Sequence, residues 1–254
     1  MTKFLNSTAK LYNRLLKRKL LDKLHSIISP AKSVNDILLD YNGTVTLKDL
    51  YDYNGQIIGA GGFGVVLQVI NKVTHEKMAI KILNVEDYVK SSSGNEETKY
   101  FKEEKGLKFL RNEVTIPQGH CHKNIMKVKR VHRTQQHVLI AMELAKCSLY
   151  DYIAAKGGKL PEEECRVIIK QLLEALQHLH ISDVVHKDIK PGNILLMSDG
   201  NLEGAVRLID FGISTKLTDA MPYELANTAG TFLYKAPEQF KGGICTTVRI
   251  SSKI

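Results

Sequence analysis

Short runs of alternating hydrophobic and polar residues occupy the first half of this chain, from about residue 56 to residue 143. β-Branched side chains at every second position are typical of half-buried strands, and Asn and Gly between the runs are typical of turns. The pattern therefore predicts antiparallel strands. They lie near Gln56–Ile58, Val65–Ile70, Met78–Leu83, Ile125–Val131 and Val138–Glu143. A helix near Lys105–Ile116 is expected before the fourth strand.

From about residue 146 onward the spacing of the apolar residues becomes helical. Pro161 followed by three glutamates predicts a helix start, because proline suits the first helical position and acids suit the positive end of the helix dipole. The buried stripe predicted for this helix consists of Cys165, Ile168, Ile169, Leu172, Leu173, Leu176 and Leu179. The chain is therefore expected to be an α+β protein. A sheet lobe over 52–145 would meet a mainly helical lobe over 146–254 in a cleft.

A basic segment precedes the predicted sheet. Of the net charge of +9, residues 1–32 carry +7, from eight Lys or Arg and one acid. Apolar residues recur there at every fourth position: Tyr12, Leu16, Leu20, Leu24 and Ile28. This predicts an amphipathic helical arm over 1–30, followed by a polar connector over 31–51. Such an arm binds an anionic membrane surface or a calmodulin-like partner, acts as an organelle presequence, or packs on its own domain with its lysines in water.

The composition excludes several classes of protein. Apolar residues make up 43% of the 254 residues and charged residues 25%, which is typical of a folded domain. No run approaches eighteen uncharged apolar residues, so no membrane-spanning helix is expected. Beyond the arm the net charge is only +2, so we expect no surface specific for nucleic acid. A secretory signal is not expected either.

The four cysteines, at positions 121, 147, 165 and 245, form no C-x-x-C pair. This spacing favours a reducing, cytoplasmic location over a disulfide framework. His120, Cys121 and His122 resemble half of a metal site, but no second pair of ligands follows at the spacing that zinc requires. We therefore interpret these three residues as the end of a helix and a turn.

Three glycines, Gly59, Gly61 and Gly64, follow the first predicted strand. A dinucleotide-binding turn has the same G-x-G-x-x-G spacing, but it requires a helix at the third glycine, whereas the residues from Val65 alternate as a strand. Glycines in a hairpin turn instead let backbone amides approach a triphosphate, and a plain tight hairpin is the alternative. Lys81 follows seventeen residues later on the third strand, where it can reach the same phosphates.

The loop and the lysine together resemble the opening of a eukaryotic protein kinase domain, and other motifs of that family follow in order. His186 to Asn193 (H-K-D-I-K-P-G-N) resembles the catalytic loop, and Asp210 to Gly212 (D-F-G) resembles the metal-binding motif. Ala236 to Glu238 (A-P-E) resembles the end of the activation segment. Glu113 precedes an H-K-N-I stretch by nine residues and resembles the helix glutamate that pairs with the strand lysine. The resemblance covers residues 52 to about 240 and implies a protein-kinase-like bilobal fold.

This resemblance implies ATP- and Mg²⁺-dependent phosphorylation of serine or threonine hydroxyls on protein substrates. The implied catalytic residues are the proton acceptor Asp188, the γ-phosphate contact Lys190, and the phosphate-binding Lys81 with its partner Glu113. The implied magnesium ligands are Asn193 and Asp210. The implied ATP contacts are Ile58, Gly59, Gly61, Gly64, Val66, Ala79, Lys81, Met142, Glu143, Ala145 and Leu195. In the activation segment, Thr231 is implied to bond the catalytic aspartate and lysine, and Thr228 to accept a phosphate.

Two features depart from the pattern of that family. Pro117 lies four residues after Glu113, and proline breaks or kinks a helix interior, so we expect the helix to end near Ile116. Only sixteen residues follow Glu238, and they contain no D-x-W-S-x-G segment. We therefore expect an incomplete kinase domain, truncated after the A-P-E motif. The alternative function is a catalytically weak or inactive nucleotide-binding and interaction module.

Overall fold

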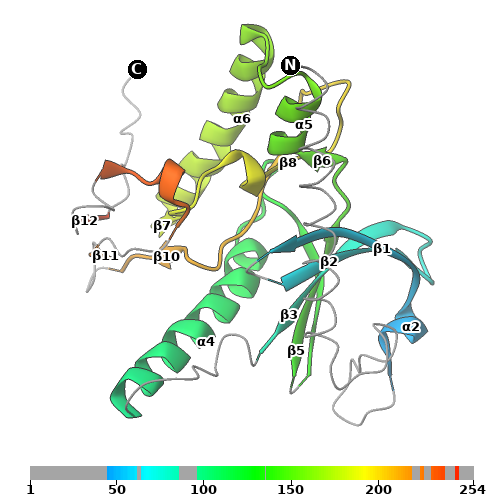
Figure 1. The fold of residues 1–254 in the computed structure, drawn as a ribbon, viewed down its shortest axis with the longest axis vertical. Helices are drawn as coiled ribbons and strands as arrows, with labels where there is room; N and C mark the ends of the chain where they lie inside the picture. The colour runs from blue at the N-terminus through cyan, green and yellow to red at the C-terminus, as the bar shows by residue number, and fades with distance from the viewer. Residues whose placement is uncertain are drawn as a thin grey trace, which may run out of the picture. The chain divides into compact units, whose positions relative to one another are not determined.

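The chain divides into two units, and an antiparallel sheet of five strands forms the first (Figure 1). The computed structural model describes residues 45–61, 64–85, 96–134, 136–218, 224–225, 230–237 and 244–245. The first unit contains the described residues up to 85 and Lys129–Glu143, and the second contains the others. The arm over 1–30, Thr228 and Glu238 lie outside the described residues.

The five strands of the first unit are joined in the order β1-β2-β3-β5-β4. Their bounds are β1 (Tyr51–Gly61), β2 (Gly64–Asn71), β3 (Lys77–Asn84), β4 (Val128–Arg133) and β5 (His137–Glu143). All five predicted strands are therefore confirmed, although the fourth begins later than expected. Ile125 belongs to the second unit, where it forms an isolated bridge with Leu208 instead of joining the sheet.

One face of this sheet carries the core of the first unit. Strand residues at alternate positions are buried there, as the period of two predicts. The core consists of Leu47, Tyr51, Val65, Leu67, Val69, Met78, Ile80, Ile82, Leu139 and Ala141. Leu47 lies in the short helix α2 (Leu47–Leu50) and is fully buried, as is Tyr51 within 2%. Both residues lie at the end of the stretch predicted to be a polar connector, and both contribute to this core.

The second unit is mainly helical, with short strands between its helices. Its helices are α4 (Glu96–Gly119), α5 (Leu149–Ala155) and α6 (Glu162–Ile181), with the 3₁₀ turns η2 (Pro191–Asn193) and η3 (Phe232–Tyr234). Its strands are β6 (Cys147–Ser148), β7 (Val184–Val185), β8 (Ile194–Leu196), β9 (Val206–Leu208), β10 (Thr215–Lys216), β11 (Glu224–Leu225) and β12 (Ile244–Cys245). The predicted α+β class is confirmed. How the two units meet stays a prediction.

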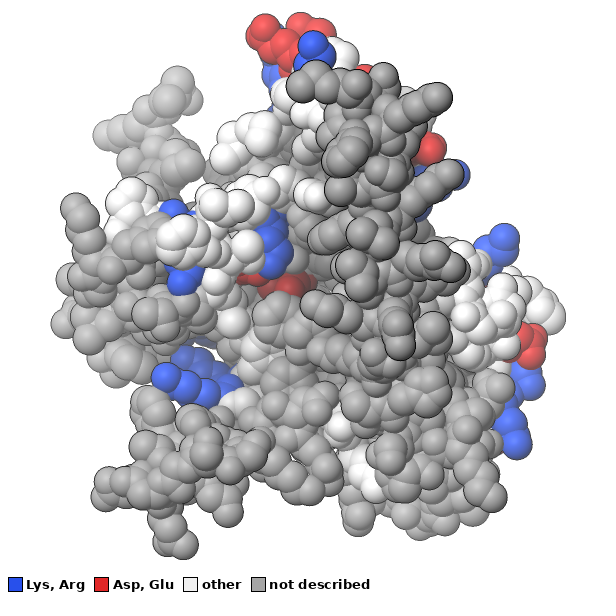
Figure 2. Space-filling model, viewed as in Figure 1, with Lys and Arg blue, Asp and Glu red and all other residues white. Residues whose placement is uncertain are grey.

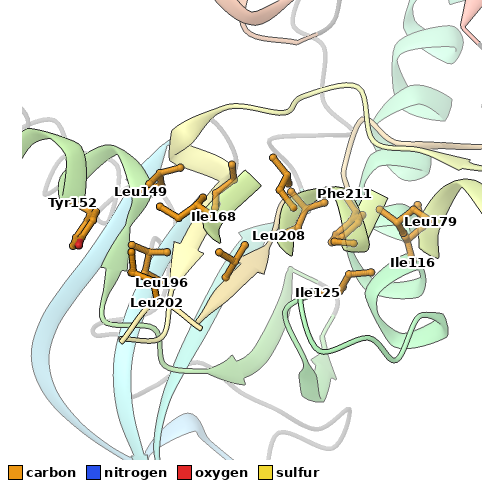
Figure 3. Packing of buried hydrophobic residues seen from close by; sticks show 14 of the residues in the cluster. Ile116, Ile125, Leu149, Tyr152, Ile168, Leu179, Leu196, Leu202, Leu208 and Phe211 are labelled. Atoms are coloured by element: carbon orange, nitrogen blue, oxygen red, sulfur yellow. The ribbon is translucent and has the colours of Figure 1, made fainter. Parts of the chain in front are cut away.

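The core of the second unit contains residues of helices α4, α5 and α6 and of strands β8 and β9 (Figure 3). Ile116 and Phe211 lie at one end of this cluster, with Leu179 of α6 beside them. Leu149 and Tyr152 of α5 lie at the other end. The apolar faces of α4, α5 and α6 therefore pack into a single cluster.

Helix α6 buries a narrower stripe than its sequence suggested. Ile168, Leu172 and Leu179 are buried as predicted, whereas Ile169 and Leu173 are 50% and 58% exposed. At 100° per residue, positions 169 and 173 lie outside the arc formed by positions 168, 172, 175 and 179. Cys165 lies beside that arc, but it is in the first turn of the helix and is exposed. Gln171 lies within the buried stripe and is only 4% exposed. The prediction of a seven-residue apolar stripe was therefore wrong for Cys165, Ile169 and Leu173.

Helix α4 continues through Pro117 to Gly119, so the expected end near Ile116 was wrong. Proline lacks an N–H and crowds the carbonyl one turn before it, but its fixed φ is compatible with helical backbone. Only two helical residues follow Pro117, so the missing hydrogen bond affects the last turn alone. The three residues His120 to His122 follow as irregular backbone, and no metal-binding group of His, Cys, Asp or Glu occurs among the described residues.

The first turn of α6 carries the predicted acidic start. Glu162, Glu163 and Glu164 follow Pro161, and Arg166 approaches the first two of them across one turn. Figure 2 shows acidic (red) and basic (blue) side chains gathered where Figure 1 places the start of α6. Within the described part of the chain, no helix combines the length and the apolar character needed to cross a membrane.

Candidate active site

The Asp188 carboxylate lies on the loop between β7 and η2 and accepts hydrogen bonds on both of its oxygens. Asp188 is 5% exposed. Its Oδ2 atom accepts hydrogen bonds from Lys190 Nζ at 2.7 Å and from Asn193 Nδ2 at 2.9 Å. Its Oδ1 atom accepts from the backbone N–H and the hydroxyl of Thr231, both at 2.9 Å. Both oxygens are therefore held, and the carboxylate has one fixed orientation.

Lys190 joins the two sides of this arrangement. Its ammonium group also donates to Thr231 Oγ1 at 2.6 Å, so the threonine hydroxyl accepts from Lys190 while it donates to Asp188. Burial raises the pKa of Asp188, but the hydrogen bonds from Lys190 and Thr231 outweigh it and leave the pKa below its ordinary value. The carboxylate is therefore charged at neutral pH, which a proton acceptor requires.

The ring of His186 forms a hydrogen bond with the backbone of this loop. It is 2% exposed, and its Nδ1 atom accepts a hydrogen bond from the Asp188 N–H at 3.3 Å. The other ring nitrogen lies 3.0 Å from the carbonyl oxygen of Ile209, so Nε2 carries the proton and the ring is neutral. Burial lowers the pKa of His186, which agrees with the neutral form. The ring also meets Phe211 edge-on, with centroids 5.1 Å apart.

We expect the free energy of unfolding to fall as the pH drops below 6.5, in part because of His186. The ordinary pKa of histidine is 6.5 and that of folded His186 is lower, so the unfolded chain takes up this proton first. The contribution of neutral His186 to the free energy of unfolding is therefore complete above pH 6.5, and it is lost as the pH falls toward the lower pKa of the folded state. Urea unfolding at pH 7.5 and 5.5 measures this loss. His186→Phe should be less stable at pH 7.5 and show a smaller difference between the two pH values; an unchanged difference would contradict the assignment.

Asn193 and Asp210 lie at the same end of a pair of strands. Asn193 directly precedes β8 and Asp210 follows β9 by two residues, and the antiparallel register pairs Ile194 with Leu208. The Ile209 N–H donates to the Asn193 carbonyl at 3.0 Å and closes this end of the pair. The Asn193 side chain gives its amide nitrogen to the backbone and side chain of Asp188, so its oxygen points away from that residue. A carboxylate and an amide oxygen are hard ligands that suit a divalent cation such as Mg²⁺.

Asp210 has a backbone conformation that is uncommon for a residue with a side chain. Its φ is +71°, and Lys187 in the loop beside it has a φ of +70°. Non-glycine residues adopt this region when surrounding contacts impose it, and such positions are frequent in active sites. Lys187 is held in part by a 2.6 Å hydrogen bond from its Nζ atom to Thr215 Oγ1. Glu113, on α4, is 5% exposed in the same unit.

In the first unit, the register of the sheet places several predicted ATP contacts on one face. Lys81 pairs with Val66 of β2, and Ala79 pairs with Met142 of β5. Directly paired residues share a face, as do residues two apart in a strand, so these four side chains lie together. Ile80 and Ile82, the neighbours of Lys81, are fully buried on the opposite face. Lys81 therefore points away from the core, as the sequence predicted.

The predicted glycine loop is the turn between β1 and β2. Gly59 pairs with Val66 and Gly61 with Gly64, while residues 62 and 63 lie outside the described residues. Gly64 has a φ of +115°, and a Cβ atom there would overlap the carbonyl oxygen of Ile82, so only glycine fits. Ile58 lies at a shift of register before Gly59 and is 41% exposed.

Three further predicted contacts are Glu143, Ala145 and Leu195, of which the first belongs to the first unit and the other two to the second. Glu143 is the last residue of β5, and Ala145 follows it in the second unit. Leu195 is the central residue of β8 and pairs with Ser148 and Arg207. Its neighbours Ile194 and Leu196 belong to the core of the second unit, so Leu195 faces the other way.

Comparison with families of known proteins gives a match to the protein kinase domain over residues 53–248. The chain belongs to the protein kinase family. Serine/threonine-protein kinase 33 of Bos taurus is 32% identical over 197 residues, which cover 76% of this chain and 37% of that protein. Maternal embryonic leucine zipper kinase of Xenopus laevis is 30% identical over 204 residues, covering 80% and 28%. Serine/threonine protein kinase OSK3 of Oryza sativa subsp. indica is 35% identical over 195 residues, covering 76% and 34%.

The chain spans about a third of the length of these kinases. The family uses ATP with a divalent metal. The structure brings Asp188, Lys190, Asn193 and Thr231 into direct contact in the second unit. It brings Val66, Ala79, Lys81 and Met142 onto one face in the first.

The sequence analysis missed two residues of this kinase that contact the D-F-G motif. Asn112 and Phe109, on α4, touch the backbone and the glycine of that motif. They precede Glu113 by one and four positions, so the helical period alone places Phe109 on the same side of α4 as Glu113. That spacing was the available signal, but it does not reveal which segment the helix faces.

Proposed function

We propose that this chain transfers the γ-phosphoryl group of ATP to serine or threonine hydroxyls of protein substrates. The observation that carries the proposal is the Asp188 carboxylate, charged and held by Lys190, Asn193 and Thr231. The names of the similar proteins, serine/threonine kinases from animals and a plant, support the choice of hydroxyl. Lys190 two residues after Asp188, bonded to Thr231, supports the same choice.

Asp188 would accept the proton of the attacking hydroxyl. A carboxylate with one fixed orientation and a lowered pKa keeps its charge, so it is ready to receive the proton as the oxygen attacks. Lys190 lies 2.7 Å from this carboxylate, which would place its ammonium group near the phosphoryl group that moves. The Asp188 carboxylate would orient the substrate hydroxyl. The Lys190 ammonium group would reduce the repulsion between the phosphate oxygens and the negative charge that develops on the attacking oxygen.

Asn193 and Asp210 would hold the divalent cation, and we propose Mg²⁺. Their oxygens are of the type that Mg²⁺ prefers, and they lie at one end of the β8–β9 pair. When bound, the cation neutralises phosphate charge that would otherwise repel the nucleophile. Lys81 and the glycine turn would contribute phosphate binding from the first unit, and Val66, Ala79 and Met142 an apolar surface for the adenine.

The test measures transfer of labelled phosphate from Mg-ATP to a basic protein substrate, followed by identification of the phosphorylated amino acid. We expect phosphoserine or phosphothreonine, and we expect Lys81→Met to lower the rate by about 10²-fold, because it removes a cation that balances phosphate charge. Lys77→Met is the matched control, since Lys77 is on the same strand but exposed.

Two outcomes would overturn the proposal. Equal labelling by the wild type and Lys81→Met would mean that the activity comes from another protein. Thermal stabilisation by ATP without any labelling would instead support the alternative, a nucleotide-binding module without turnover.

A further inference from the structure

Two side chains on one face of α4 contact the backbone that directly follows Asp210. Asn112 Nδ2 donates to the carbonyl oxygen of Ser214 at 2.7 Å and lies 3.4 Å from that of Gly212. Phe109, three residues earlier, covers Gly212 so closely that a Cβ atom at this glycine would overlap its ring. Residues three apart on a helix are neighbours on its surface, so both contacts come from one patch of α4.

The segment they contact is a tight turn. The Ser214 N–H donates to the Phe211 carbonyl at 2.9 Å, and Ser214 Oγ donates to the His186 carbonyl at 3.1 Å. Phe211 itself is buried in the core of the second unit, 2% exposed. Asp210 therefore lies between two anchored stretches, with Ile209 bonded to Asn193 before it and this turn after it.

We propose that Asn112 and Phe109 are positioning residues for Asp210, which fix the turn over 211–214 and thereby hold the aspartate in its left-handed conformation. This inference rests on the proposed function, in which Asp210 holds the divalent cation. A φ of +71° is costly for aspartate and persists only where neighbouring contacts impose it. Asn193, the last residue of η2, supplies those contacts before Asp210, and α4 supplies them after it.

The chemistry of an amide explains why asparagine suits position 112. One Nδ2 group carries two hydrogens, which can reach two carbonyl oxygens of the same turn. An aspartate of the same shape would place a carboxylate oxygen against the carbonyl oxygens of Gly212 and Ser214. Because all three oxygens are acceptors, they would repel one another. Position 212 must be glycine for a related reason, because the Phe109 ring occupies the space of a side chain. Glu113 is the next residue of α4, so a shift of this helix would move the turn and the glutamate together.

The first experiment measures metal binding directly. Mn²⁺ is titrated into the protein with saturating ADP, and free Mn²⁺ is followed by electron paramagnetic resonance. We expect Asn112→Ala to weaken Mn²⁺ binding by about tenfold, the value of one good hydrogen bond, and Asn112→Asp to weaken it at least as much. Binding of ADP in EDTA should not change. Thr115→Ala is the control, because Thr115 is exposed on the same helix and its hydroxyl donates to the Arg111 carbonyl of that helix at 2.9 Å.

The second experiment tests the contact between Phe109 and Gly212. Gly212→Ala should also weaken Mn²⁺ binding, because its methyl group displaces either the turn or the ring. Adding Phe109→Leu should restore part of the affinity, since the smaller side chain makes room. Such a rescue is not expected if the alanine acts on the turn alone.

The outcomes separate this inference from the proposed function. If Asn112→Ala lowers the melting temperature but leaves the Mn²⁺ affinity unchanged, Asn112 has a structural role only and the inference is overturned. If the wild type binds Mn²⁺ with ADP, Asn112→Ala weakens this binding and no variant labels protein, the inference stands and the proposed function fails. In an active protein, the Mg²⁺ concentration for half-maximal rate should rise in Asn112→Ala by the same factor as the Mn²⁺ dissociation constant.

Discussion

Asp188→Asn should lower kcat for phosphoryl transfer by about 10³-fold, because it removes the proposed proton acceptor and disturbs the groups around it. The aspartate accepts from donors on both oxygens, Lys190 and Asn193 on one side and Thr231 on the other. An asparagine has one acceptor and one donor group. Whichever way its amide is turned, an NH₂ group faces another donor, so one side of the arrangement must open.

The measurement for this variant is kcat and KM for ATP, together with nucleotide binding in the absence of turnover. We expect KM for ATP and the affinity for ADP to stay within about threefold, since Asp188 is proposed to act on the hydroxyl rather than on the nucleotide. Asp199→Asn is the matched control, because Asp199 is exposed and its ammonium partner Lys146 lies 3.8 Å away. A kcat that falls equally in both variants would contradict the role of Asp188.

The sheet and the candidate site could be predicted because each depends on local patterns. Alternation in β2, β3 and β5 predicts which side chains leave the core, and the register then brings Lys81 and Val66 together. In the second unit, Asp188, Lys190 and Asn193 lie within six residues, so a single turn of backbone suffices to bring them into contact. Thr231, 43 residues from Asp188, was placed by resemblance to the family alone.

The sequence could not predict features that depend on which segments pack together. Alternation and helical period treat every apolar residue as buried, yet Ile169 and Leu173 are half exposed because α6 contacts its core along one narrow side. The same rules treat every polar residue as exposed, and so miss Gln171. Pro117 was expected to end α4, but its position in the last turn leaves little helix to disrupt.

Gln171 is a buried polar residue whose bonds join three segments of the second unit. Its Oε1 atom accepts from Asn124 Nδ2 and from the Val206 N–H, both at 3.2 Å. Its Nε2 atom donates to the carbonyl oxygens of Leu202 at 2.8 Å and Val167 at 3.1 Å. α6 is thereby tied to the loop after α4 and to the start of β9, and two of the bonded residues, Leu202 and Val206, belong to the apolar cluster of the second unit.

Gln171→Leu should lower the free energy of unfolding by about 2–4 kcal/mol. It leaves the Val206 N–H and the Leu202 carbonyl without their hydrogen-bond partner, which costs about 1–3 kcal/mol for each group. Burial of the leucine side chain offsets part of this cost. The substitution keeps approximate volume and helix propensity, so neither a cavity nor a weaker helix explains the loss. Denaturant unfolding at pH 7.5 measures the change. Against a typical stability of about 5–15 kcal/mol, this is a large fraction.

The control is Gln177→Leu, the same substitution on the exposed side of α6, which should change stability by less than about 0.5 kcal/mol. If Gln171→Leu proved neutral or stabilising, the four hydrogen bonds would contribute nothing beyond what an apolar side chain supplies. The predicted loss of stability would instead mean that Gln171 holds the start of β9 in place through its bonds to Leu202 and Val206. Since Asp210 follows β9 by two residues, we expect Gln171→Leu also to weaken Mn²⁺ binding at temperatures where the protein is still folded.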